Sequence, residues 1–256
     1  MHRNGSARAG QDVGPITDLM PAFRAPLWKR AIDVFGAIVG IVCFTPVFVV
    51  LGAYIKWVSR GPVFLRQERI GLQGRPFRMW KLRTMHVNAD SRVHMKHVLA
   101  MIEDHGDGAR PMRKLDGGDP RIIPGGLWLR RLSIDELPQL LNVLTGEMSL
   151  VGPRPEMPYA FAAYRPWHAG RFNVLPGMTG LWQVSGKNRT TFQEMIRLDI
   201  KYGRALQPRS DMAILARTLP VVLGADNGSS QPAGAPRHGI RQRVWGRPMV
   251  EQGLTP

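Results

Sequence analysis

The longest apolar run of the chain lies near its N-terminus and constrains the fold more than any other feature. Residues 34–55, VFGAIVGIVCFTPVFVVLGAYI, carry no charged side chain. About 22 residues in a helix reach about 33 Å, which is enough to cross a hydrocarbon core of about 30 Å. The run is too long for the apolar region of a signal peptide, and no small-residue cleavage site follows it. It therefore predicts a membrane segment.

Two features indicate that this segment enters and leaves the membrane on one face. Positive charge flanks both of its ends, and the positive-inside rule favours the cytoplasmic side for such flanks. Pro46 lies near the middle of the run, has no backbone N–H to donate and disfavours helix at the preceding residue. The Thr45 hydroxyl can donate a hydrogen bond to an upstream carbonyl at such a bend. A bend there leaves two arms of about 17 Å, each long enough for one leaflet. The flanking cations are Arg24, Lys29, Arg30, Lys56, Arg60, Arg66 and Arg69.

The sequence thus predicts a re-entrant helix hairpin over residues 26–58 with its bend at Thr45 and Pro46. A single proline-kinked spanning helix is the alternative. We expect a flexible lead-in at 1–25 and a cytosolic domain at 59–224. Residues 225–256 are rich in Gly, Pro, Ser and Arg, which predicts a disordered basic tail.

The charge balance indicates anionic partners. Lys and Arg number 35 against 19 Asp and Glu, a formal net charge of +16. Nucleic acid, an acidic membrane face and phosphorylated substrates all suit such a chain, and charge alone does not choose among them. Cys43 is the single cysteine, which excludes an intrachain disulfide framework.

The region 59–224 predicts an α+β fold. Residues 63–69 and 77–84 read as two strands joined by a Gly-containing turn, residues 89–102 as a short amphipathic helix and residues 106–126 as a loop. Three nearby histidines raise the question of a metal site. No carboxylate or cysteine recurs at ligand spacing beside them, so surface or core histidines are expected. They are His86, His94 and His97.

The stretch RRLSIDELPQ, residues 130–139, places two carboxylates side by side in this basic chain. Apolar residues at helical spacing predict a helix that starts near residue 134 or 135, because Pro138 then falls among the first turn, and that ends at Gly146. Asp135 and Glu136 lie in its first turn, where free N–H groups favour negative charge. Ser133 with Glu136 also matches a capping box, and capping is the alternative role of the pair. Neighbouring Arg130 and Arg131 should keep Asp135 ionised.

Two glycine-rich and basic segments follow. SLVGPRPE, residues 149–156, predicts a rigid turn that presents the Arg154 guanidinium, a group suited to phosphate. LPGMTGLWQVSGKNR, residues 175–189, adds Lys187 and Arg189 around a tryptophan. Together with the paired carboxylates, they predict an anion-binding site at a membrane surface.

Three segments resemble the bacterial sugar transferase family, the monotopic phosphoglycosyl transferases, in their short form. The segments are KLRTM, RRLSIDELPQLLNVLTGEMSLVGPRP and PGMTGLWQVSGKNR, and the resemblance covers residues 27–223. The resemblance implies a re-entrant anchor, amphipathic interfacial helices and a small β-hairpin. It also implies an enzyme of the cytoplasmic membrane whose cytosolic catalytic domain moves a sugar-1-phosphate from a UDP-sugar to polyprenyl (undecaprenyl) phosphate. UMP is released, and the reaction starts the assembly of exopolysaccharide or a related glycan.

The resemblance also implies roles for single residues. Asp135 would be the nucleophile that forms an aspartyl-phosphosugar intermediate, with Glu136 assisting, and Mg²⁺ would bind at this pair. An anionic bilayer is an expected partner and nucleic acid is not, while a homo-oligomer is one option for the assembly. Three departures from the family pattern are Thr45 for its usual Ser before Pro46, Lys187 for its usual Arg, and the segment IIPGGLWLRR, residues 122–131, which lacks the threonine and arginine common after the family's DPRI. The substrate-binding positions would be Lys81, Arg83, Arg130, Arg154, Lys187 and Asn188.

Two other functional classes fit parts of the sequence. An inactive membrane scaffold of a polysaccharide complex would keep the fold without needing the Asp135–Glu136 pair. A membrane-tethered nucleic-acid-binding protein would use the same positive charge and would show strongly salt-dependent DNA binding, but it gives no reason for the sequence IDELP.

Overall fold

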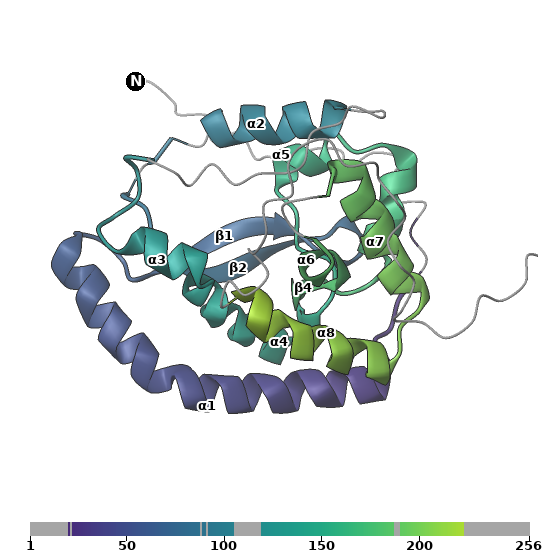
Figure 1. Ribbon diagram of the computed structural model, residues 1–256, viewed down its shortest axis with the longest axis horizontal. Coiled ribbons are helices and arrows are strands. Elements are labelled where there is room, and N and C mark those ends of the chain that lie inside the picture. Colours follow the sequence, from purple (N-terminus) through teal and green to yellow (C-terminus); the bar gives the residue numbers. More distant parts are fainter. Residues whose placement is uncertain are drawn as a thin grey trace, which may run out of the picture. The chain divides into compact units, whose positions relative to one another are not determined.

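The computed structural model describes residues 20, 22–87, 89–90, 92–104, 119–186 and 190–222 (Figure 1). The tail predicted at 225–256 lies outside the described residues, as does most of the predicted lead-in. The described chain combines helices with two small sheets, which confirms the α+β class.

The apolar run forms one long helix, α1 (Leu27–Val58), which is long and apolar enough to cross a membrane. Figure 1 shows that α1 bends along its length and follows one side of the domain. Pro46 lies within the helix, and the Thr45 hydroxyl donates to the carbonyl of Ile41 at 2.7 Å. This is the bond expected for a threonine beside a helix bend. The backbone stays helical on both sides of Pro46, so a bend and not a loop joins the two arms.

Both arms of α1 pack against the same folded body. In the first arm Ala37 is buried within one apolar cluster, with Met79 from a strand and Val143 from a later helix. In the second arm Ile55 is buried within another cluster, together with Leu82. The two clusters therefore fix both halves of the helix to one domain.

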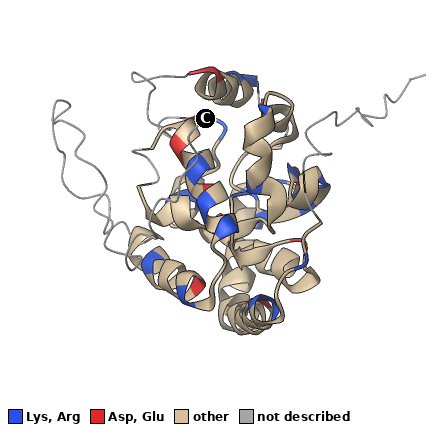
Figure 2. Cartoon of the chain, turned by 90° about the vertical axis from the view of Figure 1, so that its right-hand side faces the viewer, with Lys and Arg blue, Asp and Glu red and all other residues tan. Residues whose placement is uncertain are grey.

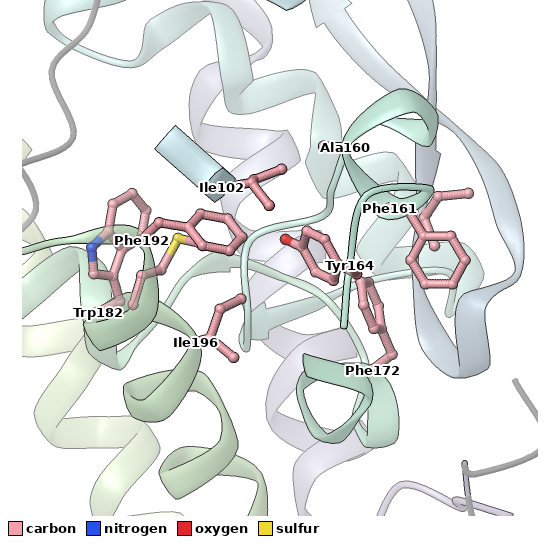
Figure 3. Close-up of a cluster of buried hydrophobic side chains, with 10 residues drawn as sticks. Ile102, Ala160, Phe161, Tyr164, Phe172, Trp182, Phe192 and Ile196 are labelled. Atoms are coloured by element: carbon pink, nitrogen blue, oxygen red, sulfur yellow. The ribbon is translucent and has the colours of Figure 1, made fainter. Parts of the chain in front are cut away.

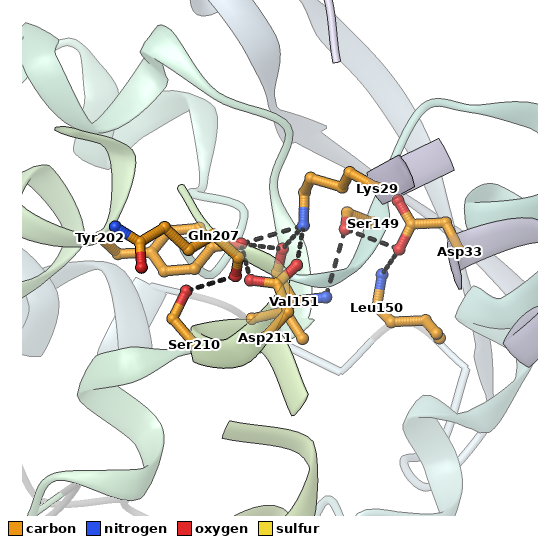
Figure 4. A network of polar contacts seen from close by, with 9 residues as sticks. All are labelled: Lys29, Asp33, Ser149, Leu150, Val151, Tyr202, Gln207, Ser210 and Asp211. Carbon is orange, nitrogen blue, oxygen red and sulfur yellow. Dashed lines mark hydrogen bonds and ion pairs between the residues drawn. The ribbon is translucent and has the colours of Figure 1, made fainter. Parts of the chain in front are cut away.

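A buried polar network anchors the beginning of α1 (Figure 4). Lys29 Nζ donates to Asp211 Oδ2 at 2.7 Å, to the Tyr202 hydroxyl at 2.9 Å and to the Val151 carbonyl at 2.9 Å. Its partners come from three separate elements of the chain. Because charges buried away from water are stable only when paired and hydrogen-bonded, this network fixes one arrangement of the helix on the domain. Asp33 adds a contact one helical turn later by accepting from the backbone N–H of Leu150 at 2.9 Å.

The two predicted strands form an antiparallel hairpin, β1 (Phe64–Ile70) and β2 (Pro76–Leu82). The turn between them is the short 3₁₀ segment η2 (Leu72–Gly74), in which Gly74 has a φ of 70°. Glycine adopts that left-handed conformation at little cost. The predicted hairpin is confirmed with small shifts at the strand ends.

The helix expected at 89–102 is α2 (Arg92–Glu103). The short helix α3 (Gly126–Arg131) then leads into the 3₁₀ segment η3 (Ile134–Gln139), which carries the carboxylate pair and continues as α4 (Leu140–Thr145). The helix start near residue 134 and the end at Gly146, whose φ is 87°, are confirmed.

The capping box, which the sequence offered as the alternative at this helix start, does not form. Ser133 lies in the left-handed region with a φ of 55° and makes no side-chain cap bond. Glu136 instead directs its carboxylate toward Arg154 and Lys81. Arg154 and Lys81 thus bind the Glu136 oxygens that a capping box would use.

A second, unpredicted sheet pairs β3 (Ser149–Val151) with β4 (Gly177–Thr179) in parallel. A Cβ added to Gly177 would lie 2.0 Å from the backbone nitrogen of Gly152, so this close approach requires glycine. The remaining elements are α5 (Pro158–Phe161), η4 (Pro166–Asn173), α6 (Leu181–Val184), α7 (Phe192–Arg204) and α8 (Pro208–Val222). Apolar side chains of α5, η4, α6 and α7 form most of the aromatic-rich core of Figure 3, in which Trp182 is buried, and Ile70 of β1 and Ile102 of α2 complete it.

Candidate active site

The carboxylate pair lies on η3, between strand β2 and helix α4. The Asp135 side chain is 8% exposed and that of Glu136 is 14% exposed. Adjacent residues of a 3₁₀ helix point about 120° apart, so the two carboxylates meet different neighbours. Their chemistry therefore follows from the separate contacts of each.

Glu136 is held by two cations. Arg154 donates to both of its oxygens, with Nη1 at 2.9 Å from Oε2, and Lys81 Nζ lies 3.3 Å from Oε1. The fork of a guanidinium matches a carboxylate in this bidentate way. The charge of Glu136 raises the pKa of Arg154 above its usual range, and both oxygens of Glu136 are used within the protein.

Asp135 has a different environment. Its oxygens accept no hydrogen bond from the described residues, and its nearest cation is Lys81, whose Nζ lies 4.0 Å from Oδ2. Burial raises the pKa of Asp135, the Lys81 charge opposes that rise, and the charge of Glu136 adds to it. The expectation that Arg130 and Arg131 keep Asp135 ionised needs correction, because Lys81 lowers its pKa more than Arg130 does and Arg131 stacks on the Trp128 ring at 5.8 Å.

The turn that carries Arg154 is held by two buried arginines that sequence reasoning missed. Arg171 Nη2 donates to the carbonyl of Arg154 at 2.9 Å, and Arg69 Nη1 to the carbonyl of Pro155 at 3.3 Å. Arg171 also pairs with Glu156 at 3.0 Å and with Asp199 at 2.8 Å. Nothing in the local sequence marks these pairings, since each arginine looks like an ordinary surface cation.

Asn142 is a further positioning residue that the sequence does not reveal. Its Oδ1 accepts from the backbone N–H of Trp80 at 2.9 Å, and its Nδ2 donates to the Arg78 carbonyl at 2.9 Å. Asn142 is fully buried and belongs to α4. It therefore ties the helix that follows the carboxylate pair to the strand that carries Lys81.

The structure brings together four of the predicted site residues, Asp135, Glu136, Lys81 and Arg154. Arg130 lies near enough for its charge to lower the pKa of Asp135. Lys187 and Asn188 lie outside the described residues, so their place in the site stays a prediction.

Arg83 is placed away from this group. It is fully buried, and its guanidinium donates to the Ser59 hydroxyl at 2.9 Å, to the Ser59 carbonyl at 2.7 Å and to the Arg60 carbonyl at 2.6 Å. These bonds fix the chain just after α1. The geometry gives Arg83 a structural role, and its expected contact with substrate stays a prediction.

Positive charge by itself does not locate the site. Figure 2 shows Lys and Arg on several separate elements, so the ion pairs around Asp135 and Glu136 are the more specific feature. Among the described residues no group of three or more His, Cys, Asp or Glu side chains is arranged to hold a metal. The ring nitrogen of His94 lies 2.7 Å from the Tyr159 hydroxyl.

Comparison with known proteins supports one family. Residues 24–225 match the bacterial sugar transferase family. The exopolysaccharide production protein ExoY of Rhizobium meliloti (strain 1021) is 37% identical over 194 residues, which cover 76% of this chain and 84% of that protein. The UDP-glucose:undecaprenyl-phosphate glucose-1-phosphate transferase of Caulobacter vibrioides is 39% identical over 232 residues, which cover 84% of this chain and 80% of that protein.

A longer relative is also a sugar-phosphate transferase by name. The UDP-glucose:undecaprenyl-phosphate glucose-1-phosphate transferase of Escherichia coli (strain K12) is 32% identical over 227 residues, which cover 86% of this chain and 45% of that protein. The family match spans most of this chain, including α1, the hairpin, the carboxylate pair and the Arg154 turn. The chain therefore belongs to the bacterial sugar transferase family.

Proposed function

We propose that the chain is a phosphoglycosyl transferase that moves a sugar-1-phosphate from a UDP-sugar to undecaprenyl phosphate and releases UMP, as the initiating step of exopolysaccharide synthesis. Family membership and the names of the relatives support this activity. The observation that supports it most directly is that the two carboxylates of the pair have different hydrogen-bond partners. Glu136 is held by Arg154 and Lys81, whereas no described residue donates a hydrogen bond to Asp135, whose nearest described cation is Lys81.

In the proposed mechanism Asp135 is the nucleophile. Its carboxylate oxygen bonds to the β-phosphorus of the UDP-sugar, and the bond from that phosphorus to the bridging oxygen breaks, so UMP leaves. A phosphate oxygen of undecaprenyl phosphate then bonds to the same phosphorus and displaces the Asp135 carboxylate. Forming such an aspartyl phosphate divides one difficult transfer into two displacements with ping-pong kinetics.

Lys81 and Arg154 supply the positive charge that this reaction needs. Both phosphates of the donor and the phosphate of the acceptor must approach two carboxylates. The Lys81 ammonium lies within 4.0 Å of an oxygen of each carboxylate. Fixed cations at such a position stabilise the charge of the transferring phosphoryl group without rearrangement. Arg130 contributes further positive charge near Asp135.

Mg²⁺ is part of the proposal. This ion binds through one or two carboxylates together with the phosphates of a substrate. The available oxygens of Asp135 fit that requirement. Glu136 fits less well, because Arg154 and Lys81 already bind its oxygens. When bound, the ion would neutralise charge on the transferring phosphate.

We also propose that α1 is re-entrant and that the domain lies on the cytosolic face of the cytoplasmic membrane. A straight helix of 32 residues would separate its ends by about 48 Å. Here Lys29 near the first end binds Asp211, while Ser59 after the last end binds Arg83. One domain thus holds both ends, which supports entry and exit on one face. Cytosolic placement follows from the cationic flanks and from the water-soluble UDP-sugar.

Cysteine labelling tests the membrane topology. In a Cys43→Ser background, single cysteines introduced at Gly10 and at Gly253 should react with an impermeant maleimide only after the cells are opened. Labelling of just one of the two positions in intact cells would establish a spanning helix instead.

Release of UMP tests the activity. The purified full chain is incubated with undecaprenyl phosphate, Mg²⁺ and a panel of UDP-sugars. One UDP-sugar should yield UMP with the native chain and with the control Asp90→Asn, whose carboxylate is exposed and pairs with Arg92. Asp135→Asn should release none. Full activity of Asp135→Asn would refute the covalent mechanism, and no release from any donor by the native chain would favour a scaffold.

A further inference from the structure

The last turn of α1 marks the level at which the chain leaves the apolar region. The uncharged run ends at Ile55, and Lys56 is the first charged residue after it. Trp57 follows and is 84% exposed. Tryptophan and tyrosine are enriched at this level of membrane proteins, because their rings have an apolar body and a polar edge that suit the headgroup layer. With α1 placed as proposed, Trp57 lies at the membrane surface.

Helix α3 packs against the same turn of α1, and Figure 1 shows it beside the end of that helix. The Tyr54 hydroxyl donates to the carbonyl of Pro124 at 3.2 Å. It also lies 2.6 Å from where a Cβ of Gly125, the residue before α3, would be. Further along α3, Leu129 is buried in the same apolar cluster as Ile55. These contacts hold α3 at the level at which α1 leaves the apolar region.

Trp128 is the exposed aromatic residue of α3, with 65% of its surface accessible. Its backbone N–H donates to the Gly125 carbonyl at 3.1 Å, so it lies one turn beyond the contact with Tyr54. Tyr54 in turn meets Trp57 edge to face, with ring centroids 6.4 Å apart. Tryptophan is highly buried on average in folded proteins. Two largely exposed tryptophans at the junction of α1 and α3 therefore indicate a surface that meets a partner.

The surroundings of this junction indicate that the partner is the bilayer. The surface continues onto the second arm of α1, where Val49 and Val50 are 68% and 67% exposed. Cations lie beside both tryptophans: Lys56 precedes Trp57, and the Arg131 guanidinium lies 5.8 Å from the centre of the Trp128 ring. Rings at the boundary of the acyl chains with cations at the lipid phosphates are the arrangement that a membrane surface favours.

We propose that Trp57 and Trp128 lie together in the headgroup layer and that Trp128 sets the height of the carboxylate pair above the lipid. Helix α3 ends at Arg131, and η3, which carries the pair, begins at Ile134. Ile134 packs against the cluster that joins α3 to α1. Trp128 is thus a positioning residue that acts through α3 and not through substrate. The inference rests on the proposed placement of α1 in the bilayer.

Tryptophan fluorescence of the full chain in vesicles of phosphatidylcholine and phosphatidylglycerol tests the location. Lipids brominated near the top of the acyl chains quench tryptophans at the headgroup boundary, and lipids brominated near the chain ends quench deeper ones. The difference between the native spectrum and that of Trp128→Phe or Trp57→Phe isolates the emission of each residue. Both emissions should be lost with the first lipid and retained with the second. The matched control is Trp167→Phe, at a 41% exposed tryptophan on η4, which packs against α7 and η2, and its emission should be retained with both lipids.

Trp128 emission that neither lipid quenches would overturn the proposal. If Trp128→Phe then also changed the oligomeric state of the chain in detergent, the surface would belong to a second copy. Because quenching does not require activity, a chain that is quenched as expected and releases no UMP refutes the proposed function alone.

Release of UMP tests the positioning role. In vesicles Trp128→Ser should lower kcat/KM for undecaprenyl phosphate by about tenfold, because a small displacement of the nucleophile costs at least that much. The KM for the UDP-sugar should stay unchanged, and Trp167→Ser should match the native chain. In detergent micelles, which hold the acceptor at no fixed height, Trp128→Ser should also match the native chain. An equal loss in micelles would show general damage to the domain and overturn the positioning role.

Discussion

Lys81 should set the pH range in which Asp135 can act. The Lys81 ammonium lies 4.0 Å from Asp135 Oδ2, and both side chains are largely buried. A pair at that distance interacts by about 1 kcal/mol in water and by about 4 kcal/mol in a protein environment of effective dielectric constant about 20. Replacing Lys81 with Met removes this attraction for the carboxylate and raises the pKa of Asp135 further.

The sign of the effect follows from the role of Asp135 as a nucleophile, which must be ionised. Activity falls as the pH drops through the pKa of Asp135, and a higher pKa moves this loss to higher pH. Since about 1.4 kcal/mol corresponds to one pH unit, the acidic limb of kcat/KM should move upward by about 0.7 to 3 pH units.

The assay is the pH profile of UMP release by the native chain, Lys81→Met and Lys81→Arg. The arginine variant keeps the positive charge and should keep the acidic limb, even where altered geometry lowers the maximal rate. The position of the limb thus separates the electrostatic effect from lost substrate binding. An acidic limb that Lys81→Met leaves in place would refute the assignment of the limb to Asp135 under the control of Lys81.

Three further changes test other parts of the site. Arg154→Gln loses the bidentate pair with Glu136 and should lower kcat for UMP release by about 10²-fold or more, and Arg154→Lys should restore little of it, because an ammonium lacks the planar fork. Asp211→Asn leaves the Lys29 charge buried and unpaired, so the free energy of unfolding, measured by thermal unfolding, should fall by about 3–5 kcal/mol. Arg83→Met should lower the melting temperature while the KM for the UDP-sugar stays unchanged, whereas a raised KM would restore the substrate-binding role.

Local patterns predicted those parts of the fold that depend on neighbours in the sequence. The β-hairpin follows from alternation and a glycine turn, and the end of α4 follows from Gly146. The carboxylate pair was placed correctly at the start of a helical segment, although that segment opens as a 3₁₀ turn around Pro138. These features depend on sterics and hydrogen bonds within a few residues, which a short stretch of sequence specifies.

The remaining features depend on pairings between distant residues. Lys29 reaches Asp211 across most of the chain, and Arg171 reaches Arg154 across a separate helix and loop. The parallel pairing of β3 with β4 joins short segments that carry little strand signal. No local periodicity encodes such contacts, because the residues next to an arginine in the sequence do not indicate whether its side chain will be buried or exposed. The burial of Arg83 is a contact of this kind, and its binding of substrate stays a prediction.

The long-range contacts also relate the membrane helix to the chemistry. Arg30 donates to the carbonyls of Val143 and Leu144, both at 2.6 Å, and so binds the last turn of α4, the helix that continues from the carboxylate pair. The adjacent Lys29 binds the carbonyl of Val151, three residues before Arg154.

Two neighbouring cations of α1 therefore hold the segment that carries Glu136 and the segment that carries its partner Arg154. A shift of α1 relative to the domain would move the two segments through separate contacts and disturb the bidentate pair between them. If α1 is seated in the bilayer as proposed, the depth of the membrane anchor and the geometry around Asp135 are fixed by the same few hydrogen bonds. An acceptor whose phosphate lies at the membrane surface and whose tail lies in the bilayer requires such a connection, because the nucleophile must stay at one height above the lipid.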